Sequence, residues 1–520
     1  MATFVVTSTA DDGAGSLRQS IVAANANGEA DSIEFDLAAG SVIDVAGGSM
    51  EISESLTIDA RSIGGITLQG SNLGFFHADF AGELVLRGVT LRDGYNVPLY
   101  VEHADRVVLE DVHVTGMDGA FAGGGGNISS PDITVIDSSF TGNISGVDGG
   151  GLSLSDPTAN VSLGLIGTGR LTIARTSFLN NRAMRGGGLS VVGFDTVSMQ
   201  ECRISDNLAR TENSFASCGG LFLYLANDAE LRDVEVADNE TSDAGSTWAG
   251  VGGAGFSDIR QLRLTQVTIA NNTAVTEGGI SIVSEEADMD VQIVQSTLTG
   301  NSASGFGTAL SAFITRARTI DLTISNSIVA GNSGSNPGVN EIELAGTDLN
   351  GGGIQLAMPG TNLITTEFED EPAAAGSIFT DDPMLSSIGF YGGSTRTMPP
   401  ILPTGGQTAS PAYNAGDNAF AVDPGPDGQF GTGDDVPLTG DQRGFPRIVY
   451  GQVDIGTAEA VIAGDANLDG RVDLADFVIL RNNFGISAGL FSTGDFNGDG
   501  RVDLADLVIL RNHFGREIDD

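Results

Sequence analysis

Lysine is missing from this 520-residue chain: its 24 basic residues are all arginine, and 68 aspartate and glutamate residues bring the formal net charge to -44. Such a negative field repels DNA and anionic membranes, which excludes nucleic acid as a partner and favours divalent cations and neutral glycans. Cysteine is scarce as well. Cys202 and Cys218 are too few for a disulfide framework, and two buried thiols are favoured over a single bridge.

Long hydrophobic runs are also missing. No stretch approaches the roughly 18 apolar residues of a membrane-spanning helix, so we expect no transmembrane segment. Residues 1–6 already follow a strand pattern, so we expect no secretory signal within the chain. Disorder is excluded because 40% of the residues are hydrophobic. The 74 glycines, about twice the usual share of roughly 7%, predict many tight turns.

A short phrase recurs along the central part of the chain: an apolar residue, two others and then asparagine. The copies end at Asn143, Asn181, Asn207, Asn239, Asn272, Asn301 and Asn332. A glycine pair and a new strand follow the first five copies, starting at Gly150, Gly187, Gly219, Gly252 and Gly278. Because the phrase is fixed while the spacing varies, the pattern indicates strands of constant length joined by loops of variable length.

The segments before each asparagine alternate apolar and polar residues, as in Ile133–Val135 and Leu171–Ile173. This period of two is typical of strands with one buried face. No helical pattern long enough for a crossover helix separates them, so the strands have to be joined by coiling. The sequence therefore predicts an all-β solenoid, a parallel β-helix, from about residue 40 to about residue 400. We expect its asparagines to adopt left-handed turns and stack their amides, and its glycines to supply the next special turn.

Both ends of this region resemble a known group of proteins. Residues 4–21 are similar to the start of secreted bacterial right-handed parallel β-helix proteins of pectin-lyase-like fold, and the Asn and Gly-Gly phrases are shared with autotransporter-type adhesins. Residues 410–416, 441–444 and 453–456 resemble the way such coils end. The resemblance implies an N-terminal strand and capping helix in residues 1–40, a right-handed coil in 41–400, and a C-terminal cap with an Asp/Gly-rich loop in 401–462.

Two copies of an acidic loop lie near the C-terminus, Asp465–Asp476 and Asp495–Asp506, and 17 of the 21 positions that start at each loop are identical. Positions 1, 3, 5, 9 and 12 carry side-chain oxygens, and position 6 is the glycine that a calcium-binding loop needs for its sharp turn. A hard cation explains four carboxylates in so short a loop. An acidic surface run does not explain two intact copies.

Each loop leads into a short apolar segment that we expect to be a helix, Leu474–Phe484 and Leu504–Phe514, ended by glycine. This duplication has aspartate, not the EF-hand glutamate, at position 12 and resembles a type I dockerin, a module that binds a cohesin partner. The resemblance implies such a module at residues 463–520 with two Ca2+ sites. The implied ligands are Asp465, Asn467, Asp469, Asp473, Asp476, Asp495, Asn497, Asp499, Asp503 and Asp506, with backbone carbonyls from Arg471 and Arg501.

The same resemblance implies a surface for a cohesin-like partner at the end of each loop and along each helix. The implied contact residues are Leu474, Ala475, Arg481, Asn482, Leu504, Ala505, Arg511 and Asn512. The Leu-Ala pairs replace the small hydroxyl pair of cellulosomal dockerins, which argues against a cellulosomal cohesin. A calcium staple that docks within its own chain is the alternative. A third Ca2+ site is a further candidate, at Asp423, Asp427, Asp434 and Asp435, against a plain solvated loop.

Stacking the strands in register gives two columns of outward residues. The first polar column reads Asp111, Asp137, Arg175, Glu201, Asp233, Gln266 and Gln295, and the second polar column, two residues on, reads His113, Ser139, Ser177, Arg203, Glu235, Thr268 and Thr297. Neighbouring turns lie about 4.8 Å apart, so the charged members should form one patch. The candidate catalytic residues are Asp137, Arg175, Glu201, Arg203, Asp233 and Glu235. A ladder of ion pairs that keeps an exposed sheet soluble is the favoured alternative.

The function we expect is that of a secreted, calcium-binding β-helix protein, outside the cell or at its surface, that binds or degrades polysaccharide. If it is an enzyme, the resemblance implies a polysaccharide lyase or glycoside hydrolase. No pectate-lyase or polygalacturonase signature surrounds its four histidines, so no catalytic residue is carried over from those families. The alternative is a non-catalytic adhesin or structural scaffold with the tail as a calcium staple.

Overall fold

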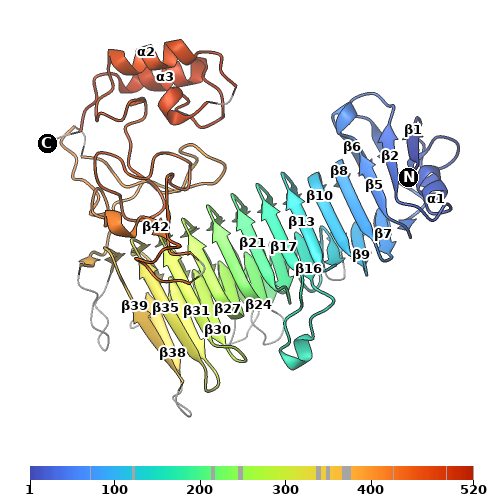
Figure 1. Ribbon diagram of the computed structural model, residues 1–520, viewed down its shortest axis with the longest axis horizontal. Coiled ribbons are helices and arrows are strands. Elements are labelled where there is room, and N and C mark those ends of the chain that lie inside the picture. Colours follow the sequence, from blue (N-terminus) through green and yellow to red (C-terminus); the bar gives the residue numbers. More distant parts are fainter. Residues whose placement is uncertain are drawn as a thin grey trace.

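The computed structural model describes residues 1–70, 72–119, 123–211, 217–243, 250–334, 341–346, 352–365, 376–403, 405–425, 427–487 and 489–518. It is a parallel β-helix of about 11 turns, followed by a C-terminal module with two helices (Figure 1). The predicted fold class is therefore confirmed. No helix in the described ranges is long and apolar enough to cross a membrane.

Three long parallel ladders form the walls of the coil. Ladder 1 contains β1 (Thr3–Val6), β2 (Asp31–Phe35), β5 (Leu56–Asp59), β8 (Glu83–Arg92), β10 (Arg106–Thr115), β13 (Asp132–Ile136), β17 (Arg170–Ala174), β21 (Thr196–Gln200), β24 (Leu221–Arg232), β27 (Ala254–Thr265), β31 (Met289–Val294), β35 (Thr319–Ser325) and β39 (Gly353–Ala357). Ladder 2 contains β3 (Val42–Asp44), β6 (Ile66–Gln69), the ends of β8 and β10, β14 (Ser139–Thr141), β18 (Ser177–Leu179), β22 (Arg203–Ser205), β25 (Glu235–Ala237), β28 (Thr268–Ala270), β32 (Thr297–Thr299), β36 (Ile328–Val329), β40 (Leu363–Ile364) and β41 (Ile378–Phe379).

The remaining strands complete each turn. Ladder 3 contains β4 (Met50–Ile52), β7 (Phe76–Asp79), β9 (Leu99–Glu102), β12 (Asn127–Ser129), β16 (Leu152–Ser155), β20 (Leu189–Val192), the starts of β24 and β27, β30 (Ile280–Ser284), β34 (Leu310–Ile314) and β38 (Ile342–Gly346). Ladder 4 contains the short strands β11 (Asp118–Gly119), β15 (Ile144–Ser145), β19 (Arg182–Ala183), β23 (Leu208–Thr211), β26 (Glu240–Asp243), β29 (Thr273–Ala274), β33 (Ser302–Ala303) and β37 (Ser333–Gly334).

The recurring asparagines form a buried ladder at the corner after ladder 2. The backbone N–H and Nδ2 of Asn143 donate to Oδ1 of Asn181 in the next turn, at 3.0 and 3.2 Å. The same pair of bonds links the later asparagines up to Asn332. The left-handed residue is the one before each asparagine, such as Gly142 or Asn180, and not the asparagine itself. The prediction of a left-handed asparagine was wrong by one position, because the ladder needs the amide to point inward.

The glycine pairs occupy a corner where successive turns approach too closely for a side chain. A Cβ on Gly150 would lie 2.1 Å from the carbonyl oxygen of Gly187 in the next turn. The left-handed residue at this corner is Gly149, which precedes the pair. The expectation that the pair itself supplies a special turn was therefore wrong: close packing between turns excludes other residues there.

Apolar side chains stack along the inside of the coil. Ile133 pairs with Leu171 and Leu171 with Val197 in successive turns. The Phe140 and Phe178 rings stack with 5.4 Å between centroids. Cys202 and Cys218 are both buried and free. At the N-terminal end, α1 (Leu17–Ala24) lies over the first turn, and the Ser16 hydroxyl accepts a hydrogen bond from the Gln19 N–H as its N-cap.

A layer of irregular chain, residues 380–462 and here called the cap, packs on the side of the later turns. It contains η3 (Asn418–Phe420) and the antiparallel pair β42 (Val422–Asp423) and β43 (Val436–Pro437). The Thr268 hydroxyl donates to the Gln442 side chain at 2.6 Å, and Asn326 Nδ2 donates to the Asp417 carbonyl at 2.8 Å. Hydrogen bonds therefore hold the cap against ladder 2 and against the corner between ladders 1 and 2.

One buried acid makes the stability of the coil depend on pH. Glu277 lies between β29 and β30, and burial raises its pKa to about 7 against the opposing hydrogen bond with Ser281. The pKa of Glu277 is higher in the folded than in the unfolded state, so protonated Glu277 favours the folded state. This stabilisation is complete below about pH 4.5 and is lost as the pH rises to about 7. Over that range the wild-type free energy of unfolding should fall by about 3 kcal/mol relative to Glu277→Gln.

Urea denaturation of both proteins at about pH 4 and about pH 8, at constant calcium, measures this difference. The variant Glu34→Gln removes one exposed charge and is the matched control. The same pH slope in wild type and Glu277→Gln would refute the assignment.

Candidate functional sites

The first polar column lies at the corner between ladders 1 and 2. Every member from Asp111 to Gln295 has a positive φ, so the column follows the bend between the two ladders, which for Asp111 lies within β10. The expectation that these residues lie on a regular outward strand face was therefore wrong. The second polar column lies in ladder 2, where its members pair turn by turn in the predicted register. The two columns therefore stand side by side on the outer surface.

Four of the six candidate catalytic residues are engaged in ion pairs. Arg175 contacts Asp137 at 2.6 Å between Nε and Oδ1, and Arg203 contacts Glu235 at 3.2 Å between Nε and Oε1. Glu235 is also fully buried, because the cap residue Arg396 covers it and donates to it from its backbone N–H at 2.8 Å and from Nε at 2.7 Å. The open part of the patch therefore does not include Glu235.

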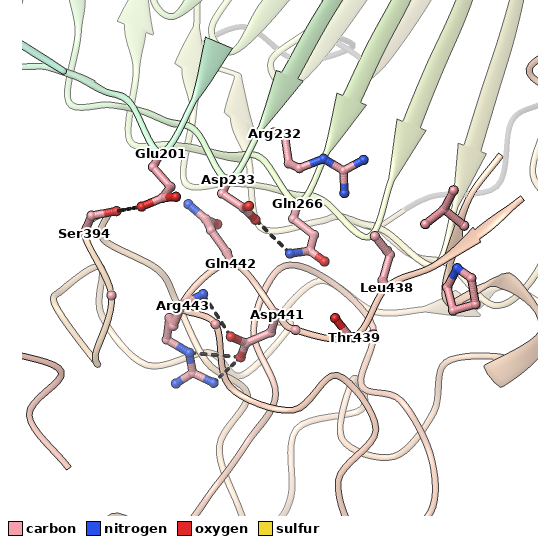
Figure 2. Close-up of a pocket in the computed structure, with 15 residues that line it drawn as sticks. Glu201, Arg232, Asp233, Gln266, Ser394, Leu438, Thr439, Asp441, Gln442 and Arg443 are labelled. Atoms are coloured by element: carbon pink, nitrogen blue, oxygen red, sulfur yellow. Dashed lines mark hydrogen bonds and ion pairs between the residues drawn. The ribbon is translucent and has the colours of Figure 1, made fainter. Parts of the chain in front are cut away.

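The other two candidates, Glu201 and Asp233, face a pocket of about 420 Å3 between the coil and the cap (Figure 2). Within the described ranges, neither takes part in an ion pair. The Ser394 hydroxyl donates to Glu201 at 3.4 Å, and Gln266 Nε2 donates to Asp233 at 2.8 Å. These two carboxylates, on neighbouring turns, are the acids of the patch that remain available.

The two acids lie in different environments. Burial raises the pKa of Asp233 to about 7, and the negative charges of Asp441 and Glu201 act in the same direction, while Arg232 and Gln266 oppose the shift. A protonated carboxyl near neutral pH can donate a proton to a bound molecule. Glu201 is half-buried at the mouth of the same pocket. The pair therefore offers a proton donor next to a second carboxylate.

The cap adds residues to this pocket that the sequence did not predict as part of the site, among them Ser394, Asp441 and Arg443. Arg443 donates to Asp441 from Nε at 3.0 Å on the far wall of the pocket. A signal was present in the first polar column, which changes from charged residues to Gln266 and Gln295 where the cap covers the corner.

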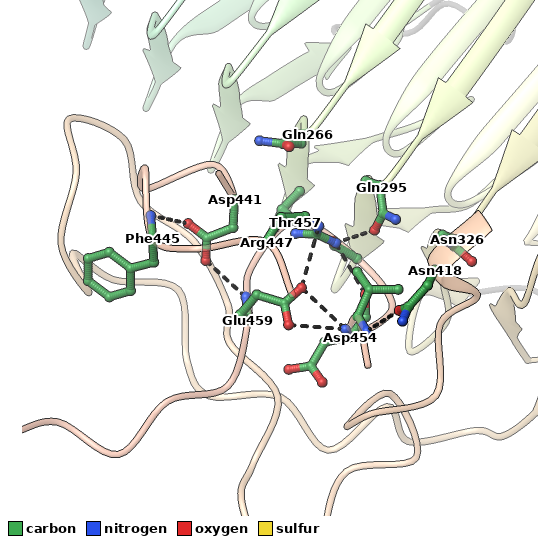
Figure 3. Close-up of polar contacts among 12 residues, drawn as sticks. Gln266, Gln295, Asn326, Asn418, Asp441, Phe445, Arg447, Asp454, Thr457 and Glu459 are labelled. Carbon is green, nitrogen blue, oxygen red and sulfur yellow. Dashed lines mark hydrogen bonds and ion pairs between the residues drawn. The ribbon is translucent and has the colours of Figure 1, made fainter. Parts of the chain in front are cut away.

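A buried polar cluster holds the cap in this position (Figure 3). Arg447, a fully buried side chain, lies 3.4 Å from Glu459 and donates to the Asp454 carbonyl at 3.1 Å and to Gln295 of the first polar column. Burial raises the pKa of Asp454 to about 6 and that of Glu459 well above its usual value. Removing one member of such a cluster would leave a buried charge without its partner, which is strongly destabilising. The cluster therefore holds the cap, and with it the far wall of the pocket, in place.

The Asp/Gly-rich loop of the cap brings together three of the four acids of the third calcium candidate. The Thr432 hydroxyl lies 2.6 Å from Asp434, 3.4 Å from Asp427 and 3.4 Å from Asp435. Asp423 does not join them, because it pairs with Arg232 of the coil.

The twin acidic loops share most of their internal hydrogen bonds. Asp465 accepts from the Gly470 N–H at 2.9 Å, and Asp495 accepts from the Gly500 N–H at 2.8 Å. At the other end, Asp476 accepts from the Asp473 N–H at 2.8 Å and Asp506 from the Asp503 N–H at 2.9 Å. The first and last carboxylates of both loops thus turn into the loop.

These inward carboxylates suit a hard cation. Asp465, Asp476, Asp495 and Asp506 are all buried, and burial together with the Asp476 charge raises the pKa of Asp465 to about 6. Buried like charges are stabilised by an ion that takes six to eight oxygen ligands. The donor set implied by the sequence therefore fits Ca2+ in both loops, with Asn467, Asp469, Asn497 and Asp499 at the intermediate positions.

The position-9 residues have a second role. Asp473 and Asp503 are the N-caps of α2 (Leu474–Asn483) and α3 (Leu504–His513), and each side chain accepts from the N–H two residues on at 2.7 Å. Position 9 of such a loop often reaches its cation through a water molecule, so both roles are compatible.

All eight residues of the expected partner surface are exposed. Leu474 and Leu504 are 67% and 68% exposed at equivalent positions of α2 and α3. Val478 and Val508, one turn further on, are 40% and 43% exposed and were missed in the sequence, although the spacing of four residues places them on the same helix face. Each helix therefore presents an unburied apolar strip that ends in arginine and asparagine.

The comparison with known families agrees with this geometry. Residues 463–515 match the family model described as Dockerin type I domain. The C-terminal module is a type I dockerin domain. Dockerin domains of this type generally bind calcium, and a dockerin implies a cohesin partner. No curated protein matched the chain.

The dockerin is seated on the cap by its face away from the partner strips. The Phe445 ring of the cap packs against Phe491 of the dockerin with 4.4 Å between centroids. The Tyr450 hydroxyl donates to Asp465 at 3.0 Å. One apolar cluster contains Phe445 together with dockerin residues such as Val472 and Leu510, so the cap contributes to the dockerin core.

The two loops differ where the second loop touches the cap. Position 4 is Leu468 in the first loop and Gly498 in the second, and both have a positive φ. A Cβ on Gly498 would lie 2.2 Å from the Cα of Gly392 in the cap. Because leucine adopts the same conformation in the first loop, the close approach to Gly392 accounts for glycine at position 498.

This contact predicts the effect of Gly498→Leu, which copies the first loop into the second. We expect calcium binding to persist and the dockerin to leave its seat, because the new side chain overlaps Gly392. Small-angle X-ray scattering of the full chain should show a larger maximum dimension. The reverse change, Leu468→Gly, is the control and should leave the maximum dimension unchanged. An unchanged scattering profile for Gly498→Leu would contradict the packing of the dockerin against the cap at Gly392.

Proposed function

We propose that the chain is an extracellular, calcium-binding β-helix protein that its dockerin attaches to a cohesin-like protein. One observation carries the proposal: both partner strips of the dockerin are exposed while its opposite face is seated on the cap. The module holds two Ca2+ ions, one in each loop, and presents α2 and α3 outward. A calcium staple that docks only within its own chain would be expected to bury its apolar surface there, whereas both apolar strips of this module are exposed.

Capture on immobilised type I cohesins tests this attachment. The full chain should bind in the presence of calcium and be released by a chelator. Failure to bind any member of a cohesin panel in calcium would leave the calcium staple as the function of the module.

The β-helix is the part that binds or degrades polysaccharide. Its strongest support is the pocket in which Glu201 and Asp233 lack ion-pair partners within the described ranges. Neighbouring turns lie about 4.8 Å apart, close to the roughly 5–5.5 Å between the carboxyl groups of retaining glycosidases. Protonated Asp233 would donate to the leaving oxygen of a glycosidic bond, and Glu201 would act as nucleophile or base.

This assignment predicts that Glu201→Gln and Asp233→Asn each lower polysaccharide cleavage by at least about a hundredfold. Reducing-end release from a panel of polysaccharides measures the effect. Asp111→Asn, in the same column but outside the pocket, is the matched control and should keep full activity. Cleavage that survives both pocket variants would remove these residues from the mechanism.

The alternative is a non-catalytic adhesin or scaffold. It is favoured by the two ion pairs that engage four of the six candidate catalytic residues, since such pairs also keep an exposed surface soluble. An adhesin should bind cells or matrix equally well after Glu201→Gln and Asp233→Asn, with no product released.

A further inference from the structure

A second pocket, of about 570 Å3, lies on ladder 3, where neither polar column takes part. It crosses β16, β20, β24, β27 and β30, a distance of about 19 Å at the usual spacing of strands. We call it the serine trough, because its floor includes Ser153, Ser155, Ser190, Ser257 and Ser281. Its length suits an extended ligand.

Two aromatic side chains stand on this floor. Phe222 and Tyr224 are outward neighbours on β24, with 6.3 Å between stacked ring centroids. Phe222 is flanked in the adjacent turns by Ser190 and Gly255, and Tyr224 by Val192 and Ser257. Both rings are partly exposed, and two of the four flanking residues, Ser190 and Ser257, carry hydroxyl groups beside them.

Two features flank the long edges of the trough. Gly164, in the loop after β16, lies against the side chain of Glu286 after β30, so this loop runs along the trough across the turns between them. At the opposite edge, Arg185 donates to both oxygens of Asp148 at 2.6 and 2.8 Å. The two rings are therefore enclosed between two rims and are not part of a flat sheet.

The charges of the trough select against anionic ligands. Among the described residues that line the trough, Arg185 is the only cation, and it forms an ion pair with the Asp148 carboxylate. Glu285 adds a negative charge at the other end, and the chain as a whole carries -44. A ligand with carboxylate or sulfate groups would meet no unpaired positive group among the lining residues.

A neutral sugar chain fits these features together. Aromatic side chains combine a large apolar face with a fixed geometry, and hydroxyl side chains both donate and accept hydrogen bonds. A pyranose ring presents C–H groups on its faces and hydroxyl groups at its edge. The trough offers a partner for each, over several successive rings.

We propose that the serine trough binds a neutral oligosaccharide, with sugar rings stacked on Phe222 and Tyr224. The proposal rests on the polysaccharide function proposed above and names for it a binding surface separate from the Glu201–Asp233 pocket and a class of glycan.

Affinity gel electrophoresis and calorimetry of the full chain with calcium test this, with xylan, glucomannan, mixed-linkage β-glucan and polygalacturonate as probes. We expect at least one neutral glycan to bind, polygalacturonate to bind at least tenfold more weakly, and Tyr224→Ala and Phe222→Ala each to weaken binding at least tenfold. Tyr224→Phe should retain binding because it keeps the ring. Phe313→Ala, in the same outward row on β34 but outside the trough, is the matched control.

The outcomes separate the site from the function. If a neutral glycan binds and the two alanine variants bind it as tightly as wild type, the trough is not the binding site, while the polysaccharide function stands. If polygalacturonate binds as tightly as the neutral glycans, the assigned glycan class is wrong. If none of the probes binds, both the trough and the polysaccharide function are overturned.

Discussion

Removing calcium from the full chain is expected to unfold the dockerin and leave the β-helix folded. Asp465, Asp476, Asp495 and Asp506 are buried, and without a cation they hold like charges in two small loops. The module is short and its core small, so binding of the metal supplies much of its folding free energy. The β-helix has its own continuous core and no part in the loops.

Amide hydrogen exchange measured with and without a chelator checks this prediction. Protection in α2 and α3 should fall by on the order of a hundredfold or more, whereas ladders 1 to 3 should keep theirs. Exchange around Phe445 and Tyr450 should also increase, because their contacts Phe491 and Asp465 belong to the dockerin.

A double variant provides a control that needs no chelator. Asp476→Asn with Asp506→Asn removes one carboxylate from the end of each loop and should reproduce the chelated state in the presence of calcium. Asp427→Asn, in the cap loop, should leave the helices protected. Helices whose exchange is the same with and without chelator would disprove calcium-dependent folding.

The fold was predictable because its repeating contacts leave marks at fixed positions of the sequence. Each asparagine bonds to the next, as Asn143 does to Asn181, so the residue type recurs although the loops between copies vary in length. The glycine pairs recur because a Cβ would strike the next turn. The finer conformations were not predictable. Whether the asparagine or its neighbour turns left-handed depends on the direction of the amide, which the residue type alone does not specify.

The twin loops were also predictable, because a metal site made from one continuous segment carries its ligands at fixed spacing. The pocket at Glu201 and Asp233 was only half predictable. The stacking of turns placed the two acids together, but Ser394 and Asp441 come from chain some 200 residues later in the sequence, and no periodicity connects them. Burial of Glu235 beneath Arg396 is a consequence of the same long-range contact.

The seat of the dockerin shows how a departure from a repeat carries information. The two loops are otherwise nearly identical, so the change from Leu468 to Gly498 marks a contact made by only one of them. Phe496, in place of Ala466, is a second difference: it packs against Phe491 at 5.4 Å between ring centroids, and Phe491 in turn packs against Phe445 of the cap. Positions that differ between the two copies therefore indicate contacts with the cap, and exposed positions that are the same in both copies indicate the partner surface.

Those identities predict how the partner surface responds to mutation. Leu474 on α2 and Leu504 on α3 are equivalent and equally exposed, so a partner that docks on one strip can dock on the other after a half turn of the module. Leu474→Asp or Leu504→Asp alone should weaken cohesin binding by less than about threefold, because one strip stays intact. The two changes together should weaken it by at least about a hundredfold, which corresponds to about 2.7 kcal/mol.

Calorimetry of the full chain with a cohesin that binds the wild type, in calcium, measures all three variants. Leu490→Asp introduces the same charge at an exposed leucine of the dockerin outside both helices, and its affinity should match wild type. A loss of affinity on Leu474→Asp alone, with none on Leu504→Asp, would mean that only the first strip is used, and the equivalence of the copies would then be limited to their calcium loops. Full affinity in the double variant would mean that the partner docks elsewhere.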